Sequence, residues 1–193
     1  MSSTPVYDWV MKRRSVRCFE QKEIPVELFK KLVNAGRVAP SAANKQPLEY
    51  IIVSDPDLRD KVFEALKWAA YIAPKCTPKG GEKPTAYIII VVNNKHKIAD
   101  FARDVGAAAE NIILTALEEG IGSCWLRSID RKKVCDMFQL PEHIEVDSVL
   151  ALGYPGESPV MVEMTDSIKY WRKDGVHYVP KRRLDDILHV NKY

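Results

Sequence analysis

The chain has 193 residues, of which 46% are hydrophobic and 28% are charged, and this composition is typical of one soluble globular domain. A formal net charge of +3 is too small to indicate nucleic-acid binding by itself. The sequence has neither a run of about 18 apolar residues nor a signal-peptide pattern, so we expect a cytoplasmic protein without a membrane span.

The N-terminal part predicts two helices separated by a basic segment. Thr4 followed by Pro5 is a typical helix start, and apolar residues at helical spacing follow it. A second helix is expected from Pro25, and either Gly36 or the segment around Ala39-Pro40 is expected to end it. Between the two helices, four of the six residues 12–17 are basic. Such a run is often only a solvated face, but arginines at the end of a helix can also bind a phosphate.

The next part of the chain predicts strands and helices joined by two unusual loops. Residues 39–47 are rich in small, hydroxyl and amide side chains, which suit either an ordinary turn or the edge of a bound heterocycle. A strand is predicted at residues 49–53 and a helix at residues 58–70. Residues 74–84 contain three prolines and a glycine pair, so we expect a mobile connection there. The apolar run at residues 87–92 predicts a strand buried on both faces.

Residues 104–129 organise the predicted fold. The first half is a helix that is apolar on nearly every side, as expected of a helix buried in a protein core. Gly120 is expected to end this helix in the left-handed conformation, and residues 123–126 to form a short buried strand. The small side chains of residues 106–109 would allow another backbone to pack closely against the helix.

The C-terminal part predicts the last core elements and an arm. Asp130 is expected to cap a short helix, and residues 146–153 to form a core strand. Residues 166–193 carry aromatic side chains in polar surroundings and a second basic cluster at residues 181–183. We predict an extended arm here, with a short helix at residues 184–189. An arm with this much aromatic surface needs something to pack on, and a partner subunit is the candidate.

These elements together predict an α+β fold with a central mixed β-sheet flanked by helices, in a single domain over residues 1–193. The four cysteines are irregularly spaced without a C-x-x-C pair, which favours free thiols over a zinc site or an iron–sulfur cluster. Neither a glycine-rich phosphate-binding motif nor a catalytic nucleophile motif occurs. A nucleotide ligand would therefore have to be held by side-chain cations.

Five short motifs follow one another along the chain. They are Arg13-Arg14-Ser15-Val16-Arg17-x-Phe19, Ala39-Pro40-Ser41-x-x-Asn44-x-Gln46-Pro47, Asp104-x-Gly106, Gly120-Ile121-Gly122-Ser123-Cys124-Trp125 and Leu152-Gly153-Tyr154-Pro155. With these motifs in this order, the sequence resembles the nitroreductase family of FMN-dependent oxidoreductases. The resemblance covers essentially the whole chain. The closing Lys181-x-Arg183 also resembles a basic pair near the C-terminus of that family.

The resemblance implies a homodimer with two FMN sites at the subunit interface and with the arm at residues 166–193 packed on the partner subunit. Residues 13–15 would contact the FMN phosphate and ribityl chain, and residues 181 and 183 would form a second phosphate-binding pair. The loop at residues 40–46 would reach the flavin from the partner subunit, and residues 124–127 would line the other side of the ring. The implied cofactor-binding residues are Arg13, Arg14, Ser15, Arg17, Pro40, Ser41, Asn44, Gln46, Cys124, Trp125, Leu126, Arg127, Lys181 and Arg183.

The resemblance also implies the chemistry. Hydride would pass from NAD(P)H to FMN and then to an electron-poor acceptor, such as a nitroaromatic compound or a quinone, in a ping-pong mechanism. The flavin would perform the redox chemistry, so no catalytic side chain or metal is expected. Arg17 would lie near the pyrimidine end of the flavin and stabilise negative charge on the reduced ring.

Two alternatives stay open at this point. One lies within the family and is reductive dehalogenation or the oxygen-dependent breakdown of flavin. The other is a basic module that binds nucleic acid through residues 12–17 and 181–183, although no nucleic-acid-binding motif accompanies these residues. A yellow colour of the purified protein would separate a flavoprotein from this second alternative.

Overall fold

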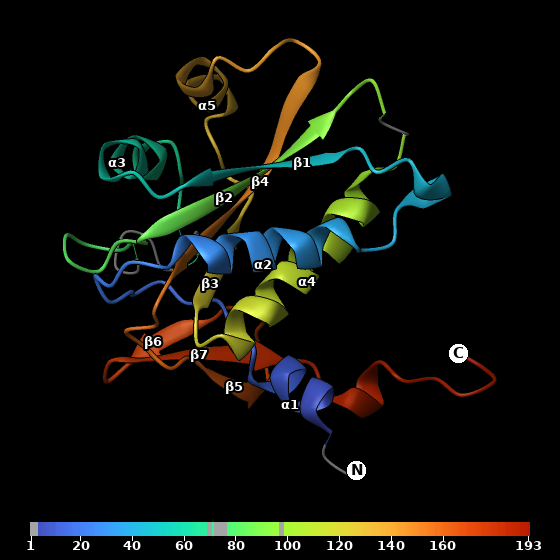
Figure 1. The fold of residues 1–193 in the computed structure, drawn as a ribbon. Helices are drawn as coiled ribbons and strands as arrows, with labels where there is room; N and C mark the ends of the chain where they lie inside the picture. The colour runs from blue at the N-terminus through green and yellow to red at the C-terminus, as the bar shows by residue number, and fades with distance from the viewer. Residues whose placement is uncertain (1–3, 69–70, 72–76, 97–98) are drawn as a thin grey trace.

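The core of the molecule is a four-stranded antiparallel sheet between two layers of helices (Figure 1). A computed structural model describes residues 4–68, 71, 77–96 and 99–193. The strand order is β1-β2-β4-β3. The strands of this sheet are β1 (Leu48–Val53), β2 (Ala86–Asn93), β3 (Gly122–Leu126) and β4 (Ile144–Gly153).

The α+β class is confirmed, but the prediction of a mixed central sheet is wrong. Every pairing in this sheet is antiparallel. Strands that alternate with helices usually indicate parallel crossovers, in which the helix returns the chain to the end where the previous strand began. After α3 (Pro56–Glu64), residues 65–85 precede β2, and β2 then pairs antiparallel with β1.

Helices cover both faces of the sheet because alternate residues of the central strands point in opposite directions. Helices α2 (Val26–Arg37) and α4 (Ala102–Glu118) lie on one face, and α3 and α5 (Arg131–Phe138) lie on the other (Figure 1). All eight residues of β2 are buried, which confirms the prediction of a strand covered on both sides. Its even-numbered residues from 86 to 92 pack toward α2 and α4, and its odd-numbered residues from 87 to 91 pack toward α3 and α5.

Helix α4 behaves as predicted for a core helix. Seven of its residues are buried, and the chain leaves it through Gly120 at a φ of 73°. The amides of Gly120 and Ile121 donate to the carbonyls of Leu117 (3.0 Å) and Ala116 (2.8 Å), which closes the C-terminal turn. The chain passes directly from this cap into β3, the edge strand of the sheet.

The predicted end of α2 at about Gly36 lies one residue from the observed end at Arg37, whereas the predicted end of the next helix is wrong. Gly36 lies inside α2, where a Cβ atom would come within 2.8 Å of Ile112 Cδ1 on α4. This glycine therefore permits the close approach of the two helices and does not end α2. The helix predicted at residues 58–70 ends at Glu64, and Leu66 then forms a β-bridge with Ile129. Residues 69–70 of that prediction, and residues 74–76 of the predicted mobile connection, lie outside the described residues.

The C-terminal part contains more regular structure than the predicted arm. Strands β5 (Val160–Glu163), β6 (Trp171–Lys173) and β7 (Val176–Lys181) form a second sheet in the order β5-β7-β6, next to α1 (Pro5–Lys12) in Figure 1. Strands β6 and β7 form a hairpin. Its turn residues Asp174 and Gly175 have φ values of 49° and 78°, as a tight two-residue turn requires. The helix predicted at residues 184–189 is only a 3₁₀ turn at Leu184–Asp186. None of the described helices is long and apolar enough to span a membrane.

Candidate functional site

Both basic clusters of the sequence meet at one cavity of about 170 Å³ beside the second sheet, and we call it the basic cavity. One wall comes from the segment that follows α1, and the other comes from the β6–β7 hairpin and the residue just before it. The fold therefore brings together cations that lie more than 160 residues apart in the sequence. The residues that line the basic cavity are Arg13, Arg14, Ser15, Arg17, Tyr170, His177, Val179 and Lys181.

The segment at residues 13–17 reaches this cavity because it lies along the free edge of β3. Ser15 forms a parallel β-bridge with Ser123, and the amide of Val16 donates to the Ser123 carbonyl at 2.9 Å. Gly122 makes this contact sterically feasible, since a Cβ atom there would lie 3.0 Å from Val16 Cγ2. Gly122 is thus a point of close approach between the two segments.

The cations of the basic cavity differ in how strongly they are already engaged. Arg14 donates to the carbonyls of Met11 (2.9 Å) and Arg13 and so closes the end of α1. Burial, with a smaller contribution from Arg13, lowers the pKa of Arg14 from its usual value. Arg13 forms a partly exposed ion pair with Glu110 of α4 at 3.3 Å. Among the described residues, the ammonium of Lys181 has no ion-pair partner, so Arg13 and Lys181 are the cations that can most readily turn to a ligand.

Arg17 is held by the C-terminal sheet and the segment before it. Its Nη1 lies 3.3 Å from Nε2 of His177 on β7, and its guanidinium lies 5.3 Å from the centre of the Tyr170 ring. Its backbone amide donates to Oε1 of Glu157, whose other oxygen accepts from Arg172 of β6. Burial and then the charges of Arg17 and Arg172 lower the pKa of His177 to about 4, so its ring is neutral near pH 7.

The sequence alone predicts an aromatic arm over residues 166–193 and assigns no role to His177, Tyr170 or Glu157. A usable signal was present in the turn pair Asp174-Gly175 between two short runs of strand-forming residues, which is typical of a β-hairpin. A hairpin in this place would have predicted that alternate residues of β7, including His177, face inward.

The strand β3 can contact a ligand through its backbone and through one side chain. The side chains of Cys124 and Leu126 are buried in the core toward α3 and α5, so they do not line an open site as expected. Trp125 points to the opposite face and is 37% exposed. Because the Ser123 carbonyl faces the free edge of β3, the backbone groups of Trp125, two residues on, face the same edge.

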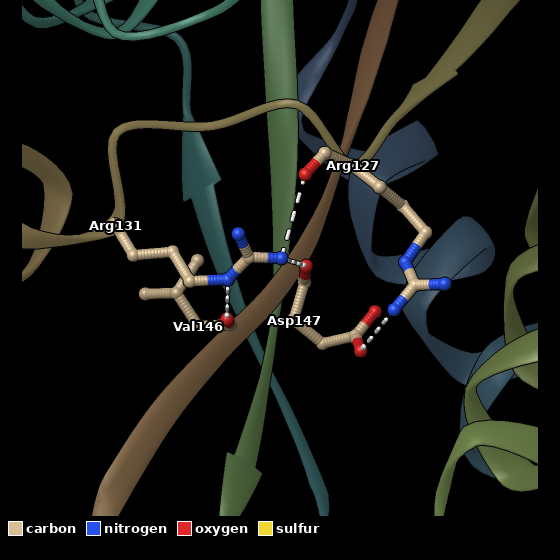
Figure 2. Close-up of polar contacts among 4 residues, drawn as sticks. All are labelled: Arg127, Arg131, Val146 and Asp147. Atoms are coloured by element: carbon tan, nitrogen blue, oxygen red, sulfur yellow. Dashed lines mark hydrogen bonds and ion pairs between the residues drawn. The ribbon is translucent and has the colours of Figure 1, made fainter.

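The residue that follows β3 is fixed against β4, as Figure 2 shows. Arg131 donates to the carbonyls of Val146 (3.0 Å), Asp147 (3.0 Å) and Arg127 (3.4 Å). The exposed guanidinium of Arg127 lies 3.9 Å from the buried carboxylate of Asp147, at a β-bulge where the register between β2 and β4 shifts. Arg127 therefore has a defined place, and it does not line the basic cavity.

The predicted ligand-binding loop at residues 41–46 is built around Asp104, a buried residue in the first turn of α4. Its carboxylate accepts from the Ser41 hydroxyl at 2.6 Å and from the Ala42 amide at 3.1 Å. The Ser41 oxygen in turn accepts from the Gln46 amide at 2.9 Å, and the Gln46 side chain donates to Asn44 Oδ1 at 3.1 Å. The hydroxyl of Ser41 is thus engaged in the loop itself.

This loop also has an unusual backbone. Ala43, Asn44 and Gln46 have φ values of 51°, 52° and 49°, in the left-handed region that residues other than glycine seldom adopt. Such conformations persist only where the surrounding contacts enforce them. Asp104 supplies those contacts, which explains physically why the third sequence motif accompanies the second.

The two predicted halves of the site do not share a cavity within one chain. Pro40, Ser41 and Gln46 line a second cavity of about 130 Å³, together with Asp104 and residues of α2 and β1. No residue lines both this cavity and the basic cavity. Arg183 lies outside both and forms an exposed ion pair with Glu163 at 3.3 Å. That the two halves meet across a subunit interface stays a prediction.

Among the described residues, no three His, Cys, Asp or Glu side chains are arranged to hold a metal ion. Cys18, Cys124 and Cys135 are free thiols, and Cys76 lies outside the described residues.

Comparison with known proteins points to one family. The sequence model of the nitroreductase family matches residues 10–154. A protein of Methanothermobacter thermautotrophicus, described as a candidate NADH dehydrogenase/NAD(P)H nitroreductase, is 30% identical over 171 residues, which cover 86% of this chain and 85% of that protein. An iodotyrosine deiodinase of Thermotoga neapolitana is 26% identical over 168 residues, covering 79% of this chain and 89% of the deiodinase.

The fold also matches solved structures. A crystal structure of a candidate nitroreductase from Desulfovibrio desulfuricans, determined in complex with FMN, superposes with a TM-score of 0.73. The match covers 100% of this chain and 99% of that chain at 19% sequence identity, and it therefore speaks for the fold alone.

Proposed function

Because this chain belongs to the nitroreductase family, we propose that it is an FMN-dependent oxidoreductase that takes hydride from NAD(P)H and passes it to an electron-poor small molecule. The observation that carries the proposal is the basic cavity, where Arg13 and Lys181 converge from opposite ends of the sequence. A phosphate monoester carries up to two negative charges, and two separated cations suit that load. Bound FMN would supply the redox chemistry itself.

The donor set of the basic cavity fits a phosphorylated cofactor. The Nε atoms of Arg14 and Arg17 are buried and have no hydrogen-bond partner, so the chain leaves donors unsatisfied on this wall. Unsatisfied buried donors are uncommon in folded proteins and call for an acceptor. In the proposed function Arg13 and Lys181 bind the phosphate. Arg17 then places a positive charge near the part of the ring that gains electrons, and this charge favours the reduced form.

We propose further that the protein is a homodimer and that each site combines the basic cavity of one chain with the 41–46 loop of the other. Two observations support a partner surface. Five residues of the last ten carry large apolar side chains that are more than half exposed, and Gly106 on α4 has open space where a side chain would lie. Surfaces of this kind are typical of subunit contacts. The exposed apolar residues near the C-terminus are Leu184, Ile187, Leu188, Val190 and Tyr193.

Phosphate anchoring is tested by comparing FMN with riboflavin. Arg13→Ala should weaken FMN by about 2–4 kcal/mol, because it removes charge-assisted hydrogen bonds to the phosphate, and should change riboflavin binding little. Lys181→Ala should act in the same direction. Arg182→Ala is the matched control, since Arg182 lies beside Lys181 but bonds to the Asp186 carbonyl outside the cavity. If the unaltered protein binds riboflavin as tightly as FMN, the phosphate does not occupy this cavity.

The shared site is tested with two inactive variants, Arg13→Glu and the double variant Asn44→Asp with Gln46→Glu. A mixed dimer would contain one site with both defects and one site with neither, if the two groups come from different chains. Coexpression with two tags and purification of the mixed dimer should therefore return up to half of the normal activity. If both groups serve the same site from one chain, every site carries a defect and no activity returns.

The acceptor is tested by reducing the flavin with NADH or NADPH without oxygen and then adding single acceptors. Reoxidation by a nitroaromatic compound or a quinone, with parallel lines in steady-state kinetics, would support the ping-pong reductase. The similarity to an iodotyrosine deiodinase makes a halogenated tyrosine the necessary comparison. Rapid reoxidation by the halogenated tyrosine, with release of halide, would favour reductive dehalogenation instead.

A further inference from the structure

His177 is a buried histidine whose ring contacts the flavin-tuning arginine of the proposed site. It lies in the middle of β7, is 2% exposed and lines the basic cavity. Its Nε2 lies 3.3 Å from Arg17 Nη1, and its ring centre lies 5.3 Å from that of Tyr170. Nothing in the family resemblance or in the comparisons gives this residue a role.

The chemistry of this contact fixes the tautomer of the ring. A guanidinium group can only donate hydrogen bonds, so His177 Nε2 must be the acceptor and the proton must lie on Nδ1. Burial, followed by the positive charges of Arg17 and Arg172 that face the ring, lowers the pKa of His177 to about 4 and keeps the ring neutral. Its Nδ1 has no partner among the described residues.

An unpaired buried N–H group destabilises a protein, and a phenylalanine in this place would not carry that cost. The gain that histidine offers over an apolar ring of similar size is the acceptor that it presents to Arg17. The Nε of Arg17 is itself buried without a partner, so the contact with His177 is the hydrogen bond that holds its guanidinium among the described residues.

The remaining contacts of Arg17 come from the same part of the chain. The Tyr170 ring, just before β6, packs against the Arg17 guanidinium. The carboxylate of Glu157, which precedes β5, accepts a hydrogen bond from the Arg17 backbone amide and also forms an ion pair with Arg172 of β6. Arg17 is therefore oriented by the C-terminal sheet and its flanking residues and not by its own segment.

We propose that His177 is a positioning residue whose Nε2 aims the Arg17 guanidinium into the basic cavity, so that the β6–β7 hairpin sets the positive charge felt by the bound flavin. This inference rests on the proposed function, because it concerns the cofactor assigned to that cavity.

The flavin midpoint potential is the measurement that separates positioning from a general effect on folding. His177→Phe keeps a ring of similar size and removes the acceptor, so the potential should fall in the same direction as in Arg17→Gln. The double variant should show no further fall, since both changes remove the same interaction. His177→Gln offers a carbonyl acceptor and should restore much of the potential.

A matched control lies on the same hairpin. Tyr178 follows His177 and stacks on Trp171 at 5.4 Å, away from the basic cavity. Tyr178→Leu should disturb the hairpin without changing the potential. An unchanged potential in a folded His177→Phe protein overturns the inference, and so does a fall that simply adds to that of Arg17→Gln. Failure of the unaltered protein to bind FMN would instead refute the proposed function.

A second measurement needs no altered protein and no flavin. The nitrogen chemical shifts of His177 in the FMN-free protein should show a neutral ring with its proton on Nδ1. A ring protonated on Nε2 could not accept from Arg17 and would overturn the inference directly.

Discussion

The basic cavity and the 41–46 loop both carry polar residues that the sequence motifs mark for a cofactor, but they hold them in different ways. In the basic cavity the Nε atoms of Arg14 and Arg17 and the Nδ1 of His177 are donors without acceptors. In the loop the Ser41 hydroxyl both donates to Asp104 and accepts from the Gln46 amide. The first region is incomplete without an acceptor, whereas the second is largely satisfied by its own contacts.

This difference shows that some residues of a family's motifs support the structure of the site, whereas others are free to contact a ligand. Ser41 is engaged on both sides, so we interpret it as a support of the loop and not as a ligand contact. The amide side chains of Asn44 and Gln46 bond to one another and remain exposed, so they are the groups that a flavin could recruit. In the basic cavity the same reasoning makes Arg14 a support and Arg13 a contact.

The largest expected effect on stability comes from removing Asp104, the residue that anchors the 41–46 loop. Asp104→Ala should lower the free energy of unfolding by about 2–4 kcal/mol, because the Ser41 hydroxyl and the Ala42 amide lose their acceptor. Urea unfolding of the FMN-free protein measures the change. Asp100→Ala is the control, since Asp100 forms only an exposed ion pair with Arg103, and it should change stability by less than about 1 kcal/mol. Equal effects of the two variants would contradict the anchor.

Lowering the pH should reduce the free energy of unfolding through protonation of His177. The folded-state pKa of about 4 lies below the usual 6.5, so between these values the unfolded chain binds more protons than the folded chain. The stability from the neutral ring is fully present above about pH 6.5 and is lost as the pH falls toward about 4, and it amounts to about 3 kcal/mol. The difference in unfolding free energy between the unaltered protein and His177→Gln, measured from pH 4 to 7, should rise with pH. A constant difference would contradict the prediction.

Arg13, in contrast to Asp104, should matter little for the stability of the FMN-free protein and strongly for FMN binding. Its ion pair with Glu110 is partly exposed, so Arg13→Ala should change the stability of the FMN-free protein by less than about 1 kcal/mol. The same change should weaken FMN binding strongly, as proposed above. Thermal unfolding with and without FMN checks both statements, because only the stabilisation by FMN should disappear. A large loss of stability without FMN would show that Arg13 is a structural residue.

The sequence predicted the fold best where local patterns and packing agree. The apolar run of β2 and the glycine after α4 predicted a doubly buried strand and a helix end, and both are confirmed. The C-terminal hairpin was not predicted, although Asp174-Gly175 signals its turn, because β6 has only three residues and all of them are exposed. Helix α2 ends one residue after Gly36, but this glycine lets α4 approach and does not cap the helix, and these two roles of a glycine look alike in a sequence.

For the site, the sequence identified the types of residue but not the contacts that their side chains make within the folded chain. The convergence of Arg13 with Lys181 depends on the pairing of segments far apart in the chain, which no local pattern contains. The inward orientation of Cys124 follows only once β3 has a register with β4. The contact between Arg17 and His177 could be predicted only if the hairpin were known first.

The smallest expected effect on stability tests whether the 41–46 loop is a strained segment whose conformation is enforced by its contacts. Ala43 has a φ of 51°, where a Cβ atom is unfavourable, so Ala43→Gly should stabilise the protein by about 0.5–1 kcal/mol after the larger entropy of the unfolded glycine is offset. Ala42 is the matched control because it is a neighbouring alanine outside the positive-φ region, and Ala42→Gly should destabilise by a similar amount. Chemical unfolding of the two variants side by side measures the contrast. If both glycines destabilise equally, the left-handed conformation of Ala43 carries no strain, and Asp104 then secures the loop only by filling its hydrogen bonds.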